Sequence, residues 1–139
     1  MPVYQISEKA NNLSKAVLDA SFYIHTQLGP GLLEKVYEEC LVHLLEKQNM
    51  KVERQKPVPV SFENVHIDTG FRLDLLVEDE LIVELKSVEK VLPLHEAQLH
   101  TYLKLSKKDL GLLLNFNVRH FKDGIKRIGM AQKTQRSFV

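Results

Sequence analysis

The chain contains a single cysteine, Cys40, and no tryptophan among its 139 residues. One cysteine excludes an internal disulfide framework and is typical of a reducing compartment, so we expect a cytoplasmic protein. The six histidines are scattered, and no cysteine–histidine cluster has the spacing of a zinc site. No apolar run approaches the ~20 residues of a membrane helix, and no basic-then-apolar signal is found at the N-terminus. We therefore expect no membrane partner.

The length and composition fit one globular domain. A chain of 139 residues that is 44% hydrophobic can bury a real core, so we expect a single domain over residues 1–139, with residues 131–139 as a flexible tail. The net charge of +1 is unevenly spread, because the first 103 residues are acid-rich and residues 104–139 carry nine basic but only two acidic side chains. A basic C-terminal third suggests a surface that faces a polyanion. For residues 132–139, a solvated tail explains the charge at least as well.

The most informative stretch is residues 71–88, which we interpret as a β-hairpin. Residues 71–77 alternate between apolar odd positions and mostly charged even positions, which predicts a strand with one buried face. The aliphatic run after residue 80 predicts a second, largely buried strand. If residues 78–80 form a three-residue turn, Asp74 lies directly opposite Glu84, and Arg72 lies opposite Lys86.

Two facing carboxylates repel each other, and burying either one as an ion is costly. A hard divalent cation such as Mg²⁺ between Asp74 and Glu84 would remove this cost, because Mg²⁺ takes carboxylate, water and phosphate oxygens as ligands. An ordinary surface ion cluster, in which Lys86 or Arg72 neutralises the pair, explains the spacing equally well. The register is itself a hypothesis, since a slip of one residue would move these side chains to the other face.

Two helices are predicted before the hairpin, over residues 8–28 and 32–49, separated by a tight turn at Gly29-Pro30-Gly31. The apolar stripe expected to be buried on the first helix consists of Leu13, Ala16, Val17, Ala20, Tyr23, Ile24 and Leu28. The stripe expected on the second helix consists of Leu33, Val36, Tyr37, Cys40, Leu41, Leu44 and Leu45.

The rest of the chain predicts four further elements besides the hairpin. Residues 51–63 predict an edge strand, because Pro57 and Pro59 cannot donate to a ladder. The other predicted elements are a helix over 94–105, a central strand over 110–116 and a last strand over 125–130, with loops at 64–70 and 117–124. The expected fold is therefore of the mixed α/β class, in the order ααβββαββ.

Three further polar residues lie at the edges of apolar helix faces. Glu34 shares a flank of its helix with Tyr37 and Leu41, which directs its carboxylate toward the interior or a cleft; a first-turn glutamate favoured by the helix dipole is an equally good reading. Gln98 and Tyr102 lie four residues apart and share a face of the third predicted helix. Tyr102 is equally explained as a core residue with its hydroxyl at the rim.

These residues resemble a known family when they are taken in order. The sequence Gly31-Leu32-Leu33-Glu34-Lys35-Val36-Tyr37 resembles the GxxExxY motif of a family of small bacterial proteins. Asp74 followed by Glu84-Leu85-Lys86 resembles the D…ExK core of the PD-(D/E)xK nuclease superfamily, and Gln98 with Tyr102 is similar to its QxxxY element. The stretches LNFN at 114–117 and DGIKRI at 123–128 also look like this family. One departure is that Leu73, not proline, precedes Asp74.

The resemblance implies a restriction-endonuclease-like core, a mixed five-stranded sheet flanked by helices, with a Mg²⁺-dependent phosphodiesterase site in which Mn²⁺ can substitute. Asp74, Glu84 and the Leu85 carbonyl would hold the metal, and Glu34 would complete its shell or bind a second ion. Lys86 would orient the attacking water and offset transition-state charge. Gln98 and Tyr102 would position the substrate phosphate or the water.

The expected partner is nucleic acid, with DNA as the first choice. Phosphate contacts would come from the basic C-terminal third, namely from Lys104, Lys107, Lys108, Lys126 and Arg127. Small nucleases of this type often pair, which leaves a homodimer open. The sequence thus supports a metal-dependent nuclease, and it leaves two alternatives: a nucleic-acid- or protein-binding module that keeps the fold without cleavage, and a structural domain whose carboxylates form ion pairs.

Overall fold

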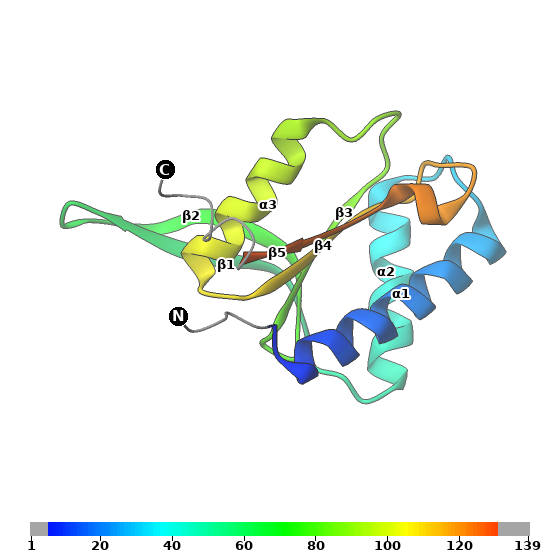
Figure 1. The fold of residues 1–139 in the computed structure, drawn as a ribbon, viewed down its shortest axis with the longest axis horizontal. Coiled ribbons are helices and arrows are strands. Elements are labelled where there is room, and N and C mark those ends of the chain that lie inside the picture. Colours follow the sequence, from blue (N-terminus) through cyan, green and yellow to red (C-terminus); the bar gives the residue numbers. More distant parts are fainter. Residues whose placement is uncertain (1–5, 131–139) are drawn as a thin grey trace.

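The computed structural model describes residues 6–130, which form one sheet with helices on both faces (Figure 1). The predicted tail at residues 131–139 lies outside the described residues. The elements are α1 Glu8–Leu28, α2 Glu34–Lys47, β1 Val52–Phe62, β2 Val65–Val77, β3 Leu81–Lys86, α3 Pro93–Ser106, β4 Leu110–Asn115, the 3-10 helix η1 Phe121–Gly124 and β5 Ile125–Gly129. None of the helices in this described part is long and apolar enough to span a bilayer.

The five strands lie side by side in the order β1-β2-β3-β4-β5. Strands β3 and β4 are parallel, and all other neighbouring pairs are antiparallel. The mixed α/β class and the order ααβββαββ are therefore confirmed. A parallel pair needs a long crossover connection, and α3 supplies it between β3 and β4. Strand β1 lies at the edge, as its prolines predict; β4, predicted to be central, is an inner strand next to the true middle strand, β3.

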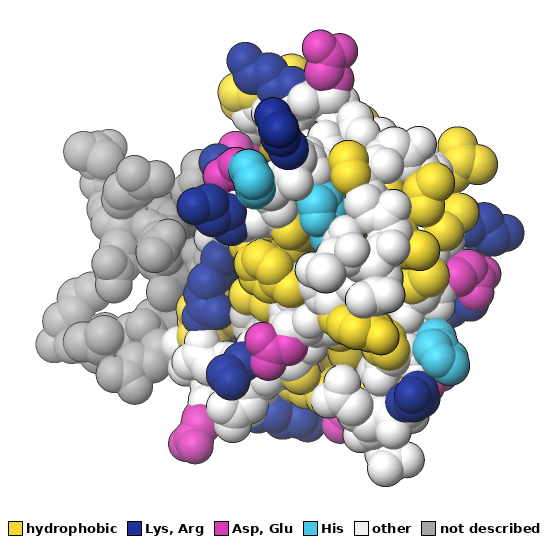
Figure 2. Space-filling view, turned by 90° about the vertical axis from the view of Figure 1, so that its right-hand side faces the viewer, with side chains coloured by type: hydrophobic (Ala, Val, Ile, Leu, Met, Phe, Trp, Pro, Cys, Tyr) yellow, Lys and Arg dark blue, Asp and Glu magenta, His cyan; other side chains and the backbone are white. Residues whose placement is uncertain are grey.

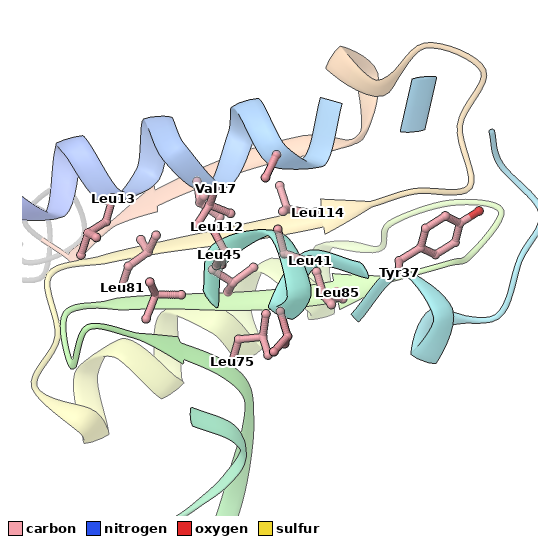
Figure 3. Close-up of a cluster of buried hydrophobic side chains, with 14 of the residues drawn as sticks. Leu13, Val17, Tyr37, Leu41, Leu45, Leu75, Leu81, Leu85, Leu112 and Leu114 are labelled. Carbon is pink, nitrogen blue, oxygen red and sulfur yellow. The ribbon is translucent and has the colours of Figure 1, made fainter. Parts of the chain in front are cut away.

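Two hydrophobic cores lie on the two faces of the sheet. Helices α1 and α2 cover one face over the larger core, in which leucines of the helices interdigitate with those of β2, β3 and β4 (Figure 3). Helix α3 covers the other face over a core of Leu73, Leu76, Ile82, Leu99, Leu103 and Leu113. Because successive strand side chains point to opposite faces, Ile82 and Glu84 of β3 point toward α3, while its other core residues point toward α1 and α2.

The first helix has the predicted bounds, whereas the second is shorter than predicted. The Ser7 hydroxyl caps α1 by accepting a hydrogen bond from Ala10 N at 3.0 Å, and Gly29 ends it with φ +73°. Helix α2 begins at Glu34 rather than residue 32 and ends at Lys47 rather than residue 49. Its start is delayed because the residues before Glu34 belong to the turn that follows α1.

Four residues predicted to lie on the buried helix stripes are exposed, which corrects the prediction. They are Tyr23, Leu28, Leu33 and Val36, with exposed fractions of 58%, 44%, 77% and 38%. Tyr23 lies beside the buried face of α1. The other three lie around the turn between α1 and α2, where the helices are not covered.

The loop predicted over residues 64–70 is wrong, because β2 begins at Val65 and pairs with β1 from its first residue. The two strands form a long hairpin that projects away from the helices (Figure 1). Residues 61–70 are exposed on both faces of this hairpin. Because neither face of this segment is buried, its sequence does not need the apolar alternation by which strands are predicted.

The single buried face predicted for residues 71–77 is also wrong, because β2 buries both faces. Leu73 and Leu76 pack under α3, whereas Leu75 packs under α1 and α2. The alternation changes at Asp74. The facing residue in β1, Gln55, has a left-handed φ of +48° and interrupts the regular pairing of the two strands. This irregularity lies next to the candidate site.

Candidate active site

The register of the β2–β3 hairpin is the one predicted from a three-residue turn. Leu75 pairs with Val83 and Val77 pairs with Leu81, so the same register places Asp74 opposite Glu84. The ladder ends at the Leu75–Val83 pair. Beyond this point β2 continues beside β1 and separates from β3 (Figure 1). The two carboxylates lie where the strands part.

Each carboxylate is held by the backbone of the strand that carries the other one. The backbone N–H of Asp74 donates to Glu84 Oε2 at 2.8 Å, and the backbone N–H of Leu85 donates to Asp74 Oδ2 at 2.8 Å. These side-chain bonds replace the backbone bonds that a continued ladder would make. Because these bonds are short and charge-assisted, they hold the carboxylates of Asp74 and Glu84 in fixed orientations.

Burial makes negative charge at this pair costly. Glu84 is only 6% exposed, and the loss of water, followed by repulsion from Asp74, raises the pKa of the Glu84 carboxyl to about 8. Burial also raises the pKa of the Asp74 carboxyl, against the lowering effects of the Leu85 N–H and the Lys86 ammonium. In the absence of a cation, the pair therefore holds a proton near neutral pH.

Glu34 is brought toward this pair by the turn between α1 and α2. Tyr37 is fully buried, stacks on Phe116 with centroids 4.5 Å apart, and donates its hydroxyl hydrogen to Gly29 O at 2.7 Å. The same hydroxyl accepts from Leu32 N at 3.1 Å. The turn that Tyr37 holds presents Glu34 as the first residue of α2. Burial raises the pKa of the Glu34 carboxyl, and the nearby Asp74 carboxylate raises this pKa further.

Lys86 is the last residue of β3, two positions after Glu84 and on the same face. Its positive charge acts on Glu34, Asp74 and Glu84, in each case favouring the ionised carboxyl. The end of the strand is fixed on both sides: Phe116 N donates to Lys86 O at 2.9 Å, and Ser87 Oγ donates to Leu32 O at 2.6 Å. The cationic side chain therefore starts from a rigid backbone.

Helix α3 supplies Tyr102 from the other layer. Its ring stacks on Phe71 with centroids 4.4 Å apart, and burial, then the charges of Glu84 and Asp74, raise the pKa of its hydroxyl. The ring therefore packs on β2, while its hydroxyl lies within the electrostatic influence of the two carboxylates. Gln98 lies one turn earlier on α3 and is exposed. The structure therefore brings together Asp74, Glu84, Lys86, Glu34 and Tyr102, whereas Gln98 is exposed one turn before Tyr102.

Two residues near the site were missed by sequence reasoning. Glu38 is 8% exposed; its carboxylate accepts from Arg54 at 3.1 and 3.2 Å and from Gln55 Nε2 at 3.0 Å, and its charge acts on Asp74. Its position four residues after Glu34 was a usable signal, because such residues share a helix face. The left-handed Gln55 had no such signal. A cleft of about 530 Å³ opens here, lined by Glu34, Lys35, Glu38, Glu39, Arg54 and Gln55.

The five basic residues predicted to contact nucleic acid lie on three segments. Lys104 is exposed near the C-terminal end of α3, and Lys107 and Lys108 follow in the loop to β4, where Lys108 pairs with Asp79 at 3.3 Å. This loop lies at the end of the sheet away from Lys86, because β4 begins beside Leu81. Lys126 and Arg127 are on β5. Arg127 donates to Ser14 Oγ at 3.2 Å and also to Asn11 of α1.

The carboxylates of Asp74 and Glu84 are the groups at this site that could bind a metal ion. Within residues 6–130, no group of three or more His, Cys, Asp or Glu side chains could by itself hold a metal. Mg²⁺ commonly takes only one or two carboxylates and completes its shell with water and phosphate oxygens. Asp74 and Glu84 supply such a pair, and a cation between them would reverse the repulsion that raises the Glu84 pKa. The residues therefore fit a hard divalent cation.

The sequence matches the family described as the PD-(D/E)XK nuclease superfamily over residues 11–128. No curated protein and no solved structure matches the chain significantly. The matched range includes every residue of the candidate site.

Proposed function

The chain belongs to the PD-(D/E)XK nuclease superfamily, and from this premise we propose that it is a Mg²⁺-dependent nuclease that hydrolyses phosphodiester bonds of DNA. The observation that carries the proposal is the pair of crossed hydrogen bonds that hold Asp74 and Glu84 together where β2 and β3 part. A buried carboxylate pair costs stability unless a cation or a proton offsets it. A metal site gives this arrangement a function.

The roles follow from the position of each side chain. Asp74 and Glu84, with the Leu85 carbonyl, would hold the metal, and Glu34 would complete the shell from α2. The bound ion, Mg²⁺ or Mn²⁺, would polarise the phosphoryl oxygen and lower the pKa of a bound water. Lys86 would orient that water and stabilise the negative charge of the transition state.

Helix α3 would contribute from the opposite layer. The Tyr102 hydroxyl, which feels the charges of Glu84 and Asp74, would donate to a substrate phosphate beside them. Gln98, one turn earlier and exposed, would contact the strand farther out. Restraint of the phosphate from both layers would hold it in line for attack.

Within the superfamily, we assign the chain to the GxxExxY group of small proteins. The motif has a physical role here, which supports the assignment. Gly31 takes a left-handed φ of +96°, Tyr37 fastens the turn by two hydrogen bonds, and Glu34 begins α2 between them. The spacing of the three residues therefore serves to present one carboxylate.

The test is cleavage of end-labelled single- and double-stranded DNA and RNA by the purified protein, with Mg²⁺, Mn²⁺ or EDTA. We expect metal-dependent cleavage of DNA that Asp74→Asn and Glu84→Gln each abolish. The matched control is Asp68→Asn, which makes the same change on the same strand at a side chain that is 96% exposed. It should cleave at the wild-type rate.

Two results would contradict the proposal. If both site variants cleave like the wild type, the assigned residues are wrong. If the wild type binds DNA in EDTA but shows no cleavage with either metal, the chain is a binding module that keeps the nuclease fold.

A further inference from the structure

A second pocket, of about 480 Å³, lies between the C-terminal end of α1 and the loop that joins β4 to β5. Four nitrogen-bearing side chains line it, namely His25, Arg119, His120 and Lys122. Among the described residues that line the pocket, none is acidic. We call this the basic pocket; its chemistry favours an anion, because arginine and lysine recognise phosphate groups.

The basic pocket also contains aromatic surface. Phe22 is 41% exposed and packs edge-on against the buried Phe121, with centroids 5.1 Å apart. The side of the molecule that carries this pocket shows histidine and basic side chains beside exposed apolar ones (Figure 2). An exposed ring beside cations can stack on an unpaired base while the cations bind its phosphate.

The walls of the basic pocket are fixed in place. His25 Nε2 contacts Val118 O at 2.7 Å, and the His25 ring lies 5.4 Å from the Phe121 ring, which ties the β4–β5 loop to α1. Phe121 also packs on Phe116, with centroids 4.8 Å apart. The loop that carries Arg119 and Lys122 is therefore held against α1, which lowers the entropic cost of ordering this loop on binding.

Both walls are connected to the candidate active site. On one side, Gly29 lines the pocket and is fastened to Tyr37, in the turn that presents Glu34. On the other side, the β4–β5 loop begins at Phe116, whose N–H donates to Lys86 O at 2.9 Å. The basic pocket thus lies at the same end of the sheet as Lys86, and a strand that crosses the site can reach it.

We propose that the basic pocket binds one nucleotide of a single nucleic-acid strand, with its phosphate at Arg119 and Lys122 and its base against Phe22. This inference rests on the proposed nuclease function and extends it. The pocket would hold the strand a short way from the bond to be cleaved, and it favours an unpaired segment over a duplex. None of the five basic residues predicted from the sequence lies in it.

The test is anisotropy of a 3′-labelled 12-nucleotide DNA strand in EDTA, so that binding is measured without cleavage. The double variant Arg119→Gln/Lys122→Gln removes both cations from the one bound phosphate, so it should weaken binding about tenfold and reduce the slope of log K against log salt by about 0.7. The matched control, Lys9→Gln/Lys15→Gln, removes the same charge from exposed positions of α1. It should change neither quantity by more than a small fraction of that effect.

A second variant tests the aromatic contact. Phe22→Leu keeps the apolar bulk against Phe121 but removes the stacking face, and it should weaken single-strand binding by about fivefold or more while leaving duplex binding unchanged. Equal effects of the pocket and control double variants, or no effect of Phe22→Leu, would overturn the proposal. Addition of dAMP at a concentration equal to the Kd of the strand should leave the strand bound. Displacement of the strand by dAMP would instead assign the pocket to a free nucleotide and overturn the proposal.

The two proposals can fail separately. Strand binding through the basic pocket in EDTA, without cleavage in Mg²⁺, would refute the nuclease and leave the pocket. Metal-dependent cleavage with pocket variants that bind and cleave like the wild type would refute the pocket and leave the nuclease.

Discussion

Asp74 and Glu84 are joined crosswise: Asp74 N donates to the Glu84 carboxylate, and the residue after Glu84 donates its N–H to the Asp74 carboxylate, both at 2.8 Å. The two acids therefore replace the next rung of the β2–β3 ladder. This relationship brings two negative groups together in a buried place. Most of the expected behaviour of the protein follows from how that charge is compensated.

The stability of the metal-free protein should depend on pH through Glu84. Its carboxyl has an ordinary pKa of 4.5 and a folded-state pKa of about 8, so the folded state keeps a proton that the unfolded chain releases. The stabilising contribution is therefore complete below pH 4.5 and is lost as the pH rises through about 8. Urea unfolding in EDTA at pH 5, 7 and 9 measures this loss. Glu84→Gln should flatten the profile between pH 5 and 9, and an unchanged slope would show that Glu84 is not its source.

Affinity for Mg²⁺ should rise with pH. Below pH 8 the ion must displace the proton on the carboxylate pair, so the apparent affinity should increase by up to about tenfold per pH unit and level off above pH 8. Isothermal titration with Mg²⁺ or Mn²⁺ at pH 6, 7, 8 and 9 tests this. Asp74→Asn should remove most of the affinity, whereas Asp68→Asn should keep it. Affinity that is independent of pH would argue against a site at this pair.

Replacement of Lys86 should separate catalysis from metal binding. Lys86→Met removes the ammonium beside the carboxylates while its unbranched side chain keeps most of the packing, and we expect cleavage to slow by about 10²-fold or more. Because the positive Lys86 ammonium repels a cation, its removal should leave the Mg²⁺ affinity unchanged or increase it. Single-turnover cleavage and metal titration report the two effects. Lys90→Met, at an exposed position after β3, serves as the control. Equal rates for the two variants would remove Lys86 from the mechanism.

The turn before α2 should lose stability when the hydroxyl of Tyr37 is removed. Tyr37→Phe keeps the stack on Phe116 but removes the bonds to Gly29 O and Leu32 N, which should lower the free energy of unfolding by about 1–2 kcal/mol. Because the same turn presents Glu34, cleavage should also fall under conditions where the variant is folded. Tyr23→Phe makes the same change at a ring that is 58% exposed, and it should be neutral. Chemical denaturation and cleavage assays give both results.

The secondary structure and the central hairpin were largely predictable. The α1 bounds follow from apolar spacing and from Gly29, and the register that sets Asp74 against Glu84 follows from the length of the turn at residues 78–80. These features are local, and a segment of a few residues has few alternative hydrogen-bonding patterns and side-chain directions. The pairing of two acids was itself a signal, since a chain rarely places them opposite each other without compensation.

Features that depend on distant packing were not predictable. The outer part of the β1–β2 hairpin, residues 61–70, is a strand pair without apolar alternation, because it is exposed on both faces. Glu38 is buried because Arg54 and Gln55 of β1 meet it across the fold. The basic pocket exists because η1 folds back against the end of α1.

Local sequence was enough to predict the order of the elements, the turn that sets the two acids face to face, and the chemistry that those acids can support. Contacts between distant segments were needed to establish the change of alternation in β2 beside Gln55, the placement of Glu34 near the site by Tyr37, and the hydrogen bonds of Arg127 to α1. This division arises because side-chain direction follows from neighbours along the chain, whereas burial and charge compensation depend on which distant surfaces the fold brings into contact.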